Sequence, residues 1–310
     1  MEPSIVYRSA AMSKVMELLE RVSGTDANVL ISGESGVGKS LLAEQIHRLG
    51  GRRDRPFVTV PCANLPAELF ESELFGHEPG AHTDATERRA GKFEAADGGT
   101  VLLDGVEAMA SPLQAKLLRV VQEKSFERLG GTHQVTVDIR LIASAGETIE
   151  QEVKAGRFRE DLFYRLNVVH LKVPPLRERA DDIGPLASHF LRLLSARHGG
   201  GQRRLTTEAR RVLKAYRWPG NVRELSNILE SAVIATEGRE IDVAKLGINK
   251  GTVAEEAVRE AFEKRWSLDA LEAAYIREVL KAARGNKSRA AAVLGINRKT
   301  LLQKLKRSGH

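Results

Sequence analysis

Cysteine, long apolar runs and repeated segments are scarce or missing in this chain of 310 residues. Cys62 is its one cysteine, so no disulfide can form within the chain, which fits a reducing compartment. The first ten residues hold no basic stretch followed by an apolar run, and no segment reaches about 18 unbroken apolar residues. These absences predict neither a signal peptide nor a membrane span, and the expected location is the cytoplasm.

The net charge of +7 is concentrated near the C-terminus. Residues 267–310 hold ten basic and three acidic side chains, whereas the other 266 residues are balanced. A basic segment on an otherwise neutral chain is typical of attachment to nucleic acid. Charge alone fits a solvated helical face equally well, so the motifs in this segment have to decide between the two.

Apolar runs that alternate with helical patterns over the first 173 residues predict a parallel α/β sheet with helices on both faces. The expected strands are 29–31, 57–60, 100–103, 137–143 and 168–173. Two consecutive prolines then break the pattern, and helical patterns alone follow up to residue 236. The expected segments are an α/β subdomain (1–173), a helical lid subdomain (174–237), a linker (238–266) and a small all-α domain (267–310).

Residues 33–40 follow the first expected strand and fit the pattern G-x-x-x-x-G-K-[ST]. Glycines let the backbone wrap phosphates, with N–H groups pointing inward at a helix N-terminus. In such a loop Lys39 reaches the β- and γ-phosphates and Ser40 binds Mg²⁺, while Asp104, after the third strand, joins the metal shell. ATP and Mg²⁺ are therefore the predicted ligands. The predicted nucleotide-binding residues of the loop are Gly33, Glu34, Ser35, Gly36, Val37, Gly38, Lys39 and Ser40.

Three strings outside this loop resemble the AAA+ activators of sigma-54 RNA polymerase. They are residues 71–78 (ESELFGHE), 174–179 (PPLRER) and 218–225 (WPGNVREL). The resemblance implies a P-loop AAA+ fold that forms ATP-dependent rings, usually hexamers. It also implies that Arg159 and Arg165 act as arginine fingers on a neighbouring subunit's ATP, and that Arg223 contacts the nucleotide from the lid.

The chain departs from the family's pattern at three catalytic positions. Gly105 stands where the family has the Glu that polarises water, Pro61 where it has the Asn coupled to that Glu, and Gly146 where it has the Asn that senses the γ-phosphate. Loss of a general base typically costs about 10²- to 10⁴-fold, so we expect ATP binding with poor hydrolysis. Glu107 stands at a different backbone position and is not expected to replace that Glu directly. The alternatives are an active sigma-54-dependent ATPase and a non-catalytic subunit in a mixed ring with a competent relative.

A fourth departure falls on the loop that touches sigma-54 in the family, which reads Gly-Ala-Phe-Thr-Gly-Ala. The loop residues here are Gly80, Ala81, His82, Thr83, Asp84 and Ala85. His82 replaces the aromatic contact residue and Asp84 adds a negative charge, so contact with sigma-54 polymerase is expected to be impaired. No receiver or sensing domain precedes the ATP-binding segment in this sequence, so any signal is expected to arrive through another protein or through the level of expression.

The basic C-terminal segment has the pattern of a helix-turn-helix, with expected helices at 268–283, 287–294 and 297–307. Residues 285–306 resemble the Fis-type module of the same family. This pattern favours double-stranded DNA, bound by dimers, over a basic bundle that binds no DNA. The candidate DNA-binding residues are Lys287, Ser288, Arg289, Asn297, Arg298, Lys299, Thr300, Gln303, Lys304 and Lys306.

Overall fold

The computed structural model describes residues 5–63, 67–81, 85, 87–198, 201, 203–248, 262, 265–283 and 286–307. Two compact units make up the chain, residues 1–247 and residues 248–310. Within the described ranges, no helix combines the length and the apolar character that crossing a membrane requires.

The first unit is built on a parallel sheet, which confirms the predicted α/β class. The five strands run in the order β2-β5-β8-β1-β9. They are β1 (Val29–Ser32), β2 (Phe57–Pro61), β5 (Thr100–Asp104), β8 (Arg140–Ala145) and β9 (Val169–Lys172). Because all five are parallel, their carboxyl ends meet at one edge, where loops of such sheets bind ligands.

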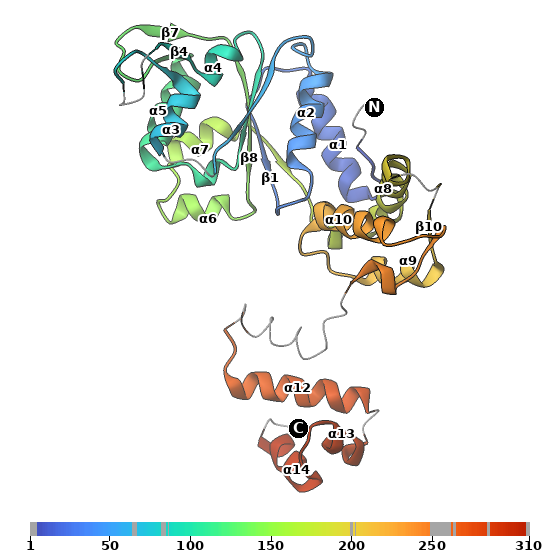
Figure 1. Ribbon diagram of the computed structural model, residues 1–310. Helices are drawn as coiled ribbons and strands as arrows, with labels where there is room; N and C mark the ends of the chain where they lie inside the picture. Colours follow the sequence, from blue (N-terminus) through green and yellow to red (C-terminus); the bar gives the residue numbers. More distant parts are fainter. Residues whose placement is uncertain are drawn as a thin grey trace. The chain divides into compact units, whose positions relative to one another are not determined.

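Helices cover both faces of the sheet (Figure 1). On one face lie α1 (Ala10–Ser23) and α2 (Lys39–Leu49), and on the other lie α3 (Ala67–Phe75), α4 (Lys92–Ala95), α5 (Ser111–Glu123), α6 (Ile149–Lys154) and α7 (Glu160–Leu166). Side chains of β1 alternate between the two faces, so Val29 and Ile31 join one buried apolar cluster and Leu30 joins the other. This interior strand thereby contributes side chains to both cores.

The fourth strand begins later than the sequence predicts. Val137 and Ile139 are buried, at 3% and 1% exposed, but β8 starts at Arg140. The backbone N–H of Val137 instead donates to the carbonyl oxygen of Lys124 at 2.9 Å. Two short antiparallel pairs lie near this part of the unit: β6 (Ser125–Glu127) with β7 (Gln134–Thr136), and β3 (Gly76–His77) with β4 (Arg89–Ala90). The apolar pattern therefore predicted correctly that Val137 and Ile139 are buried, but wrongly that they belong to the strand.

Three helices form the lid that follows the sheet: α8 (Ile183–His198), α9 (Thr207–Ala215) and α10 (Asn221–Ile234). The hydroxyl of Thr206 accepts a bond from the N–H of Ala209 at 3.2 Å and so caps α9. Trp218, fully buried before α10, donates its indole N–H to the carbonyl oxygen of Leu213 at 2.9 Å.

Part of the expected linker packs on the lid. Strand β10 (Arg204–Leu205) pairs in parallel with β11 (Glu240–Ile241), and the 3-10 turn Ala244–Leu246 follows. Ile241 and Leu246 are 0% and 2% exposed. These two apolar side chains explain why the first unit extends to Gly247, beyond the boundary expected from its polar neighbours.

The second unit holds three helices, α12 (Leu268–Ala282), α13 (Lys287–Val293) and α14 (Arg298–Arg307). Its small core is formed by Ile276, Val279, Ala283, Ala290, Ala291 and Leu301. Asn286 caps α13, since its side-chain oxygen accepts from the N–H groups of Ser288 and Arg289. Leu301 is 0% exposed, whereas the neighbouring Leu302 is 37% exposed.

Candidate nucleotide site and DNA-facing helix

The predicted phosphate loop lies between β1 and α2, at the carboxyl edge of the sheet. Gly36 and Gly38 have positive φ angles of 79° and 103°, which favour glycine. A Cβ on Gly36 would lie 2.3 Å from the carbonyl oxygen of Gly220, whereas one on Gly38 would have nothing within 4 Å. Gly36 is thus the point at which the lid packs directly against the loop backbone.

Lys39 is held inside the loop. Its ammonium donates to the carbonyl oxygens of Gly33 and Glu34 at 2.7 and 3.0 Å. Burial lowers the pKa of Lys39, and the negative charges of Glu107 and Asp104 oppose that lowering. A half-buried ammonium whose partners are neutral carbonyl groups is well suited to exchange them for phosphate oxygens.

Ser40 and Asp104 come together next to the loop. The Ser40 hydroxyl oxygen lies 3.5 Å from Oδ2 of Asp104, and the hydroxyl of Ser144 donates to Oδ1 of the same carboxylate. Hydroxyl and carboxylate oxygens are the hard donors that Mg²⁺ prefers, so these two residues fit a magnesium ion beside bound phosphates.

The three catalytic departures lie at the ends of three neighbouring strands. Pro61 ends the edge strand β2 opposite Asp104, Gly105 follows β5, and Gly146 follows β8. Proline has no N–H to donate, which an edge strand tolerates. Gly105 has a φ of 77° and donates its N–H to the carbonyl oxygen of Ser144 at 3.1 Å. The sheet therefore gathers positions 61, 105 and 146 at the same edge as the phosphate loop.

Arg223 of the lid reaches the phosphate loop. Its guanidinium donates to the hydroxyl of Ser35 at 3.1 Å. The backbone N–H groups of Val222 and Arg223 both bond to the carbonyl oxygen of Gly36, at 3.0 and 3.3 Å. The N-terminal end of α10 is therefore fixed to the loop that would hold the phosphates.

Two residues that sequence reasoning missed join the lid to the loop. The fully buried Asn221 donates its amide to Glu34 at 2.9 Å and to the carbonyl oxygen of Ser35 at 3.0 Å. Arg177 forms an ion pair with Glu34 at 2.7 Å, and this hydrogen-bonded arginine lowers the pKa of that carboxyl group. Arg177 lies in the string 174–179 and Asn221 in the string 218–225, so the resemblance pointed to both segments. No spacing rule linked either residue to Glu34.

The candidate arginine fingers lie at the two ends of α7. Arg159 caps the helix and pairs with Asp161 at 2.7 Å, a contact that raises the pKa of the arginine and lowers that of the acid. Arg165 lies in the last turn, with an exposed side chain and a carbonyl oxygen that accepts from Asn28 at 2.9 Å. Both guanidinium groups are therefore accessible at the surface of the first unit.

The base of the predicted sigma-54 loop is closed by its own backbone. The N–H of Gly80, whose φ is 84°, donates to the carbonyl oxygen of Ala85 at 2.7 Å. Ala81 is described and Ala85 is buried, whereas the predicted contact residues His82, Thr83 and Asp84 lie outside the described residues.

Most of the candidate DNA-binding side chains lie on the surface of the second unit. Those that are exposed are Lys287, Ser288, Arg289, Asn297, Arg298, Lys299 and Gln303. Asn297 uses its oxygen to cap α14, accepting from the N–H and the hydroxyl of Thr300 at 2.8 and 2.9 Å. Lys304 is paired with Glu272 of α12, and the side chain of Lys306 lies outside the described part.

Three family models match the chain in succession. The sigma-54 interaction domain matches residues 5–172 and the AAA+ ATPase lid domain matches residues 177–260. The model for bacterial regulatory proteins of the Fis family matches residues 267–307.

Relatives match over nearly the whole chain. The transcriptional regulatory protein FlbD of Caulobacter vibrioides is 43% identical over 98% of this chain and 70% of its own length. The regulatory protein AtoC of Escherichia coli is 45% identical over 98% of this chain and 68% of its own. Crystal structures of NtrX from Brucella abortus in complex with ADP and with ATP give TM-scores of 0.75 and 0.74 at 36% and 37% identity. Each covers 100% of this chain and 70% of its own.

Proposed function

This chain belongs to the family of sigma-54-dependent transcriptional activators, and on that premise we propose that it uses ATP to assemble a DNA-binding ring. Hydrolysis in this ring is slow, and sigma-54 contact is weakened. One observation carries the proposal: the groups that hold a nucleotide are gathered at the loop, while Pro61, Gly105 and Gly146 beside them offer no side chain that can polarise water. Its place of action is the cytoplasm.

Binding of ATP is supported by the loop and by the neighbouring structures. The similar NtrX chains are complexes with ADP and with ATP. In this chain Gly33 to Ser40 form the loop, and the ammonium of Lys39 and the guanidinium of Arg223 both bond to residues of it. Ser40 and Asp104 would hold Mg²⁺, which would neutralise phosphate charge.

Slow hydrolysis follows from what the edge of the sheet lacks. The family's Glu would leave the backbone at Gly105, and glycine has no group to accept a proton. Pro61 and Gly146 likewise lack the amides that the resemblance implies at their positions. Losing a positioned general base slows a reaction by about 10²- to 10⁴-fold.

Assembly of the ring requires that ATP binds but not that it is hydrolysed. A ligand at about 100 times its Kd stabilises the state that binds it by about 2.7 kcal/mol. Arg159 and Arg165, both exposed at the two ends of α7, would couple the ATP of one subunit to the next. A ring would then present several helix-turn-helix domains together, and linked attachment raises apparent affinity by about 10²- to 10⁴-fold.

The DNA partner follows from the Fis-type match and the exposed basic residues of α13 and α14. These domains bind as dimers at half-sites about one helical turn apart. Sigma-54 contact is expected to be weak because His82 and Asp84 replace an aromatic residue and a glycine in the loop that the resemblance assigns to it.

The proposal is tested by measuring phosphate release at saturating Mg-ATP together with nucleotide binding in the same sample. We expect ATP to bind and phosphate to appear at least about 10²-fold more slowly than with a family member that retains the Glu. Release at that member's rate would contradict slow hydrolysis. Normal release that appears on mixing with such a member, and needs Arg159 and Arg165, would identify a mixed ring instead.

A further inference from the structure

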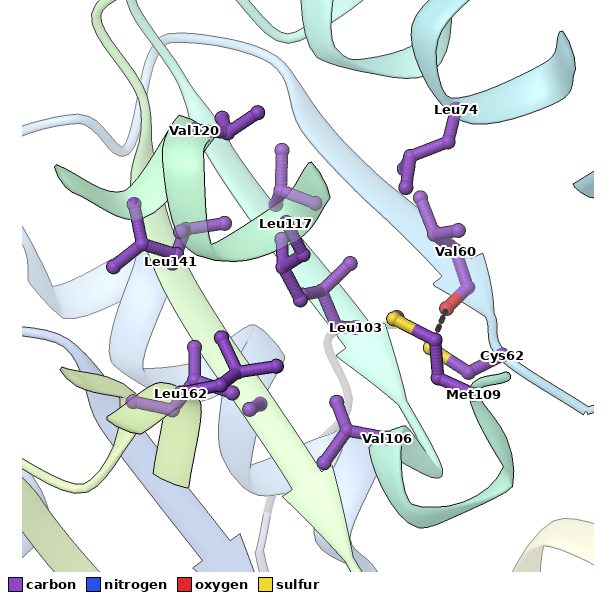
Figure 2. Packing of buried hydrophobic residues seen from close by; sticks show 14 of the residues in the cluster. Val60, Cys62, Leu74, Leu103, Val106, Met109, Leu117, Val120, Leu141 and Leu162 are labelled. Carbon is purple, nitrogen blue, oxygen red and sulfur yellow. Dashed lines mark hydrogen bonds between the residues drawn. The ribbon is translucent and has the colours of Figure 1, made fainter. Parts of the chain in front are cut away.

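Glu107 is fixed in a rigid turn beside the phosphate loop. It lies in the 3-10 turn Val106–Ala108, which follows β5 and begins at the left-handed Gly105. Figure 2 shows Val106 and Met109 within the apolar cluster that also holds Leu103, and they are 0% and 4% exposed. Because Val106 and Met109 are buried at the two ends of this turn, the backbone that carries the Glu107 carboxylate has little freedom.

One oxygen of this carboxylate is anchored at the edge of the sheet. Oε1 of Glu107 accepts the backbone N–H of Gly146 at 2.8 Å. Gly146 follows Ala145, whose carbonyl oxygen accepts the N–H of Gly33, the first residue of the phosphate loop, at 3.3 Å. The carboxylate is also near enough to Lys39 to oppose, more strongly than Asp104, the lowering of that pKa by burial.

The other oxygen has no partner. Oε2 of Glu107 is buried and makes no hydrogen bond to any described residue. A buried carboxylate oxygen without a donor is unfavourable, and such atoms in native structures usually serve a water, an ion or a reaction. The same carboxylate interacts electrostatically with Lys39 of the loop that would hold the phosphates, so a water molecule beside them would supply the donor that this oxygen lacks.

Gly146 leaves room for the carboxylate of Glu107 at this position. A Cβ on Gly146 would lie 3.0 Å from Oε1 of Glu107, so the Asn that the resemblance implies at 146 would crowd the carboxylate. Glycine at this position removes one side chain and supplies the N–H that anchors another. The departures at 105 and 146 therefore occur together with a carboxylate that occupies the same edge from a new backbone position.

We propose that Glu107 is the catalytic base for the ATP turnover that this chain retains. In that step the oxygen of the attacking water bonds to the γ-phosphorus, and Glu107 takes up the proton that the water loses. The bond from that phosphorus to the bridging oxygen breaks, and its electron pair leaves with ADP. This inference rests on the proposed ATP binding. Turnover is slow because the base lies on a turn and not directly after Asp104, where the family has its Glu.

The matched variants are Glu107→Gln and Glu147→Gln. Glutamine at 107 can still accept the N–H of Gly146 but cannot take up the proton. Glu147 follows Gly146 directly, is 45% exposed and lies 4.0 Å from Lys172, so its variant makes the same charge change outside the site. We expect Glu107→Gln to lower the residual phosphate release about tenfold or more, and Glu147→Gln to leave it unchanged.

A second readout is the affinity for ATP relative to ADP, measured by calorimetry without turnover. Removing a carboxylate that faces the γ-phosphate should favour ATP about threefold or more in Glu107→Gln alone. Phosphate release by Glu107→Gln that is unchanged or faster would overturn the role of Glu107. So would the absence of any release by the unsubstituted protein. Normal-rate release that Glu107→Gln abolishes would instead refute slow hydrolysis and keep Glu107 as the base, so the two proposals fail separately.

Discussion

At the scale of single residues, Gly105 has open space where a side chain would begin. Its φ of 77° lies in the left-handed region, and a Cβ added to it would meet nothing within 4 Å. A Cβ at this position would therefore meet conformational strain and no steric clash. The left-handed conformation costs a residue with a Cβ about 1–2 kcal/mol.

Gly105→Glu should accordingly raise phosphate release about tenfold or more, because it restores a carboxylate at the family's position, and should lower the free energy of unfolding by about 1 kcal/mol. Gly98→Glu is the matched control, since Gly98 has a φ of 72°, equal open space and a place before β5 instead of after it. Phosphate release and chemical denaturation measure the two effects. Equal release by the two variants would exclude Gly105 as the cause of slow turnover.

The residues of the phosphate loop could be predicted because the motif is local and its glycine positions follow from phosphate binding. The contact between Glu107 and Gly146 could not. It joins residues that follow two different strands and depends on the conformation of Gly105, which no spacing in the sequence encodes.

At the scale of elements, helical and strand patterns located most segments, and the errors have one cause. Apolar residues mark burial, and burial does not require regular pairing. Val137 and Ile139 are buried outside any strand, and Ile241 and Leu246 are buried within an expected linker. Contacts between the lid and the phosphate loop could likewise not be predicted from the sequence, because Glu34 lies 143 residues from Arg177.

The ion pair between Glu34 and Arg177 makes the lid contact sensitive to acid. The arginine holds the pKa of Glu34 below its usual 4.5, so the pair stabilises the folded state above that pH and is lost as pH falls through the lowered value. Arg177→Ala should remove no more than about 1 kcal/mol at neutral pH, and its effect on the free energy of unfolding should vanish as the pH falls below the lowered pKa of Glu34. Denaturant titrations across this range measure the difference.

The control for this effect is Arg211→Ala, which removes a pair with Glu208 whose two side chains are 72% and 58% exposed. It leaves the lid contact intact, so it should keep the acid dependence of the unchanged protein. An Arg177→Ala effect of the same size at every pH would show that Arg177 stabilises the lid by packing alone.

At the scale of the whole molecule, attachment to DNA depends on basic side chains that are free to meet phosphates and bases. Lys299→Ala should weaken DNA binding about three- to tenfold and reduce the salt dependence of binding by about one ion. Lys304→Ala should weaken it less, because Glu272 already engages that ammonium. Binding titrations at several salt concentrations compare the two, and a larger loss with Lys304→Ala would reverse the assignment.

ATP-driven assembly is the central claim, and sedimentation of the unchanged protein and of Lys39→Ala, each with and without Mg-ATP, tests it most directly. Lys39 donates to two loop carbonyl groups and would bind phosphate, so its loss should abolish nucleotide binding. We predict that ATP converts the unchanged protein into ring-sized particles before more than a small part of the ATP is consumed, and that Lys39→Ala does not respond. Identical sedimentation of the unchanged protein with and without ATP would contradict the account.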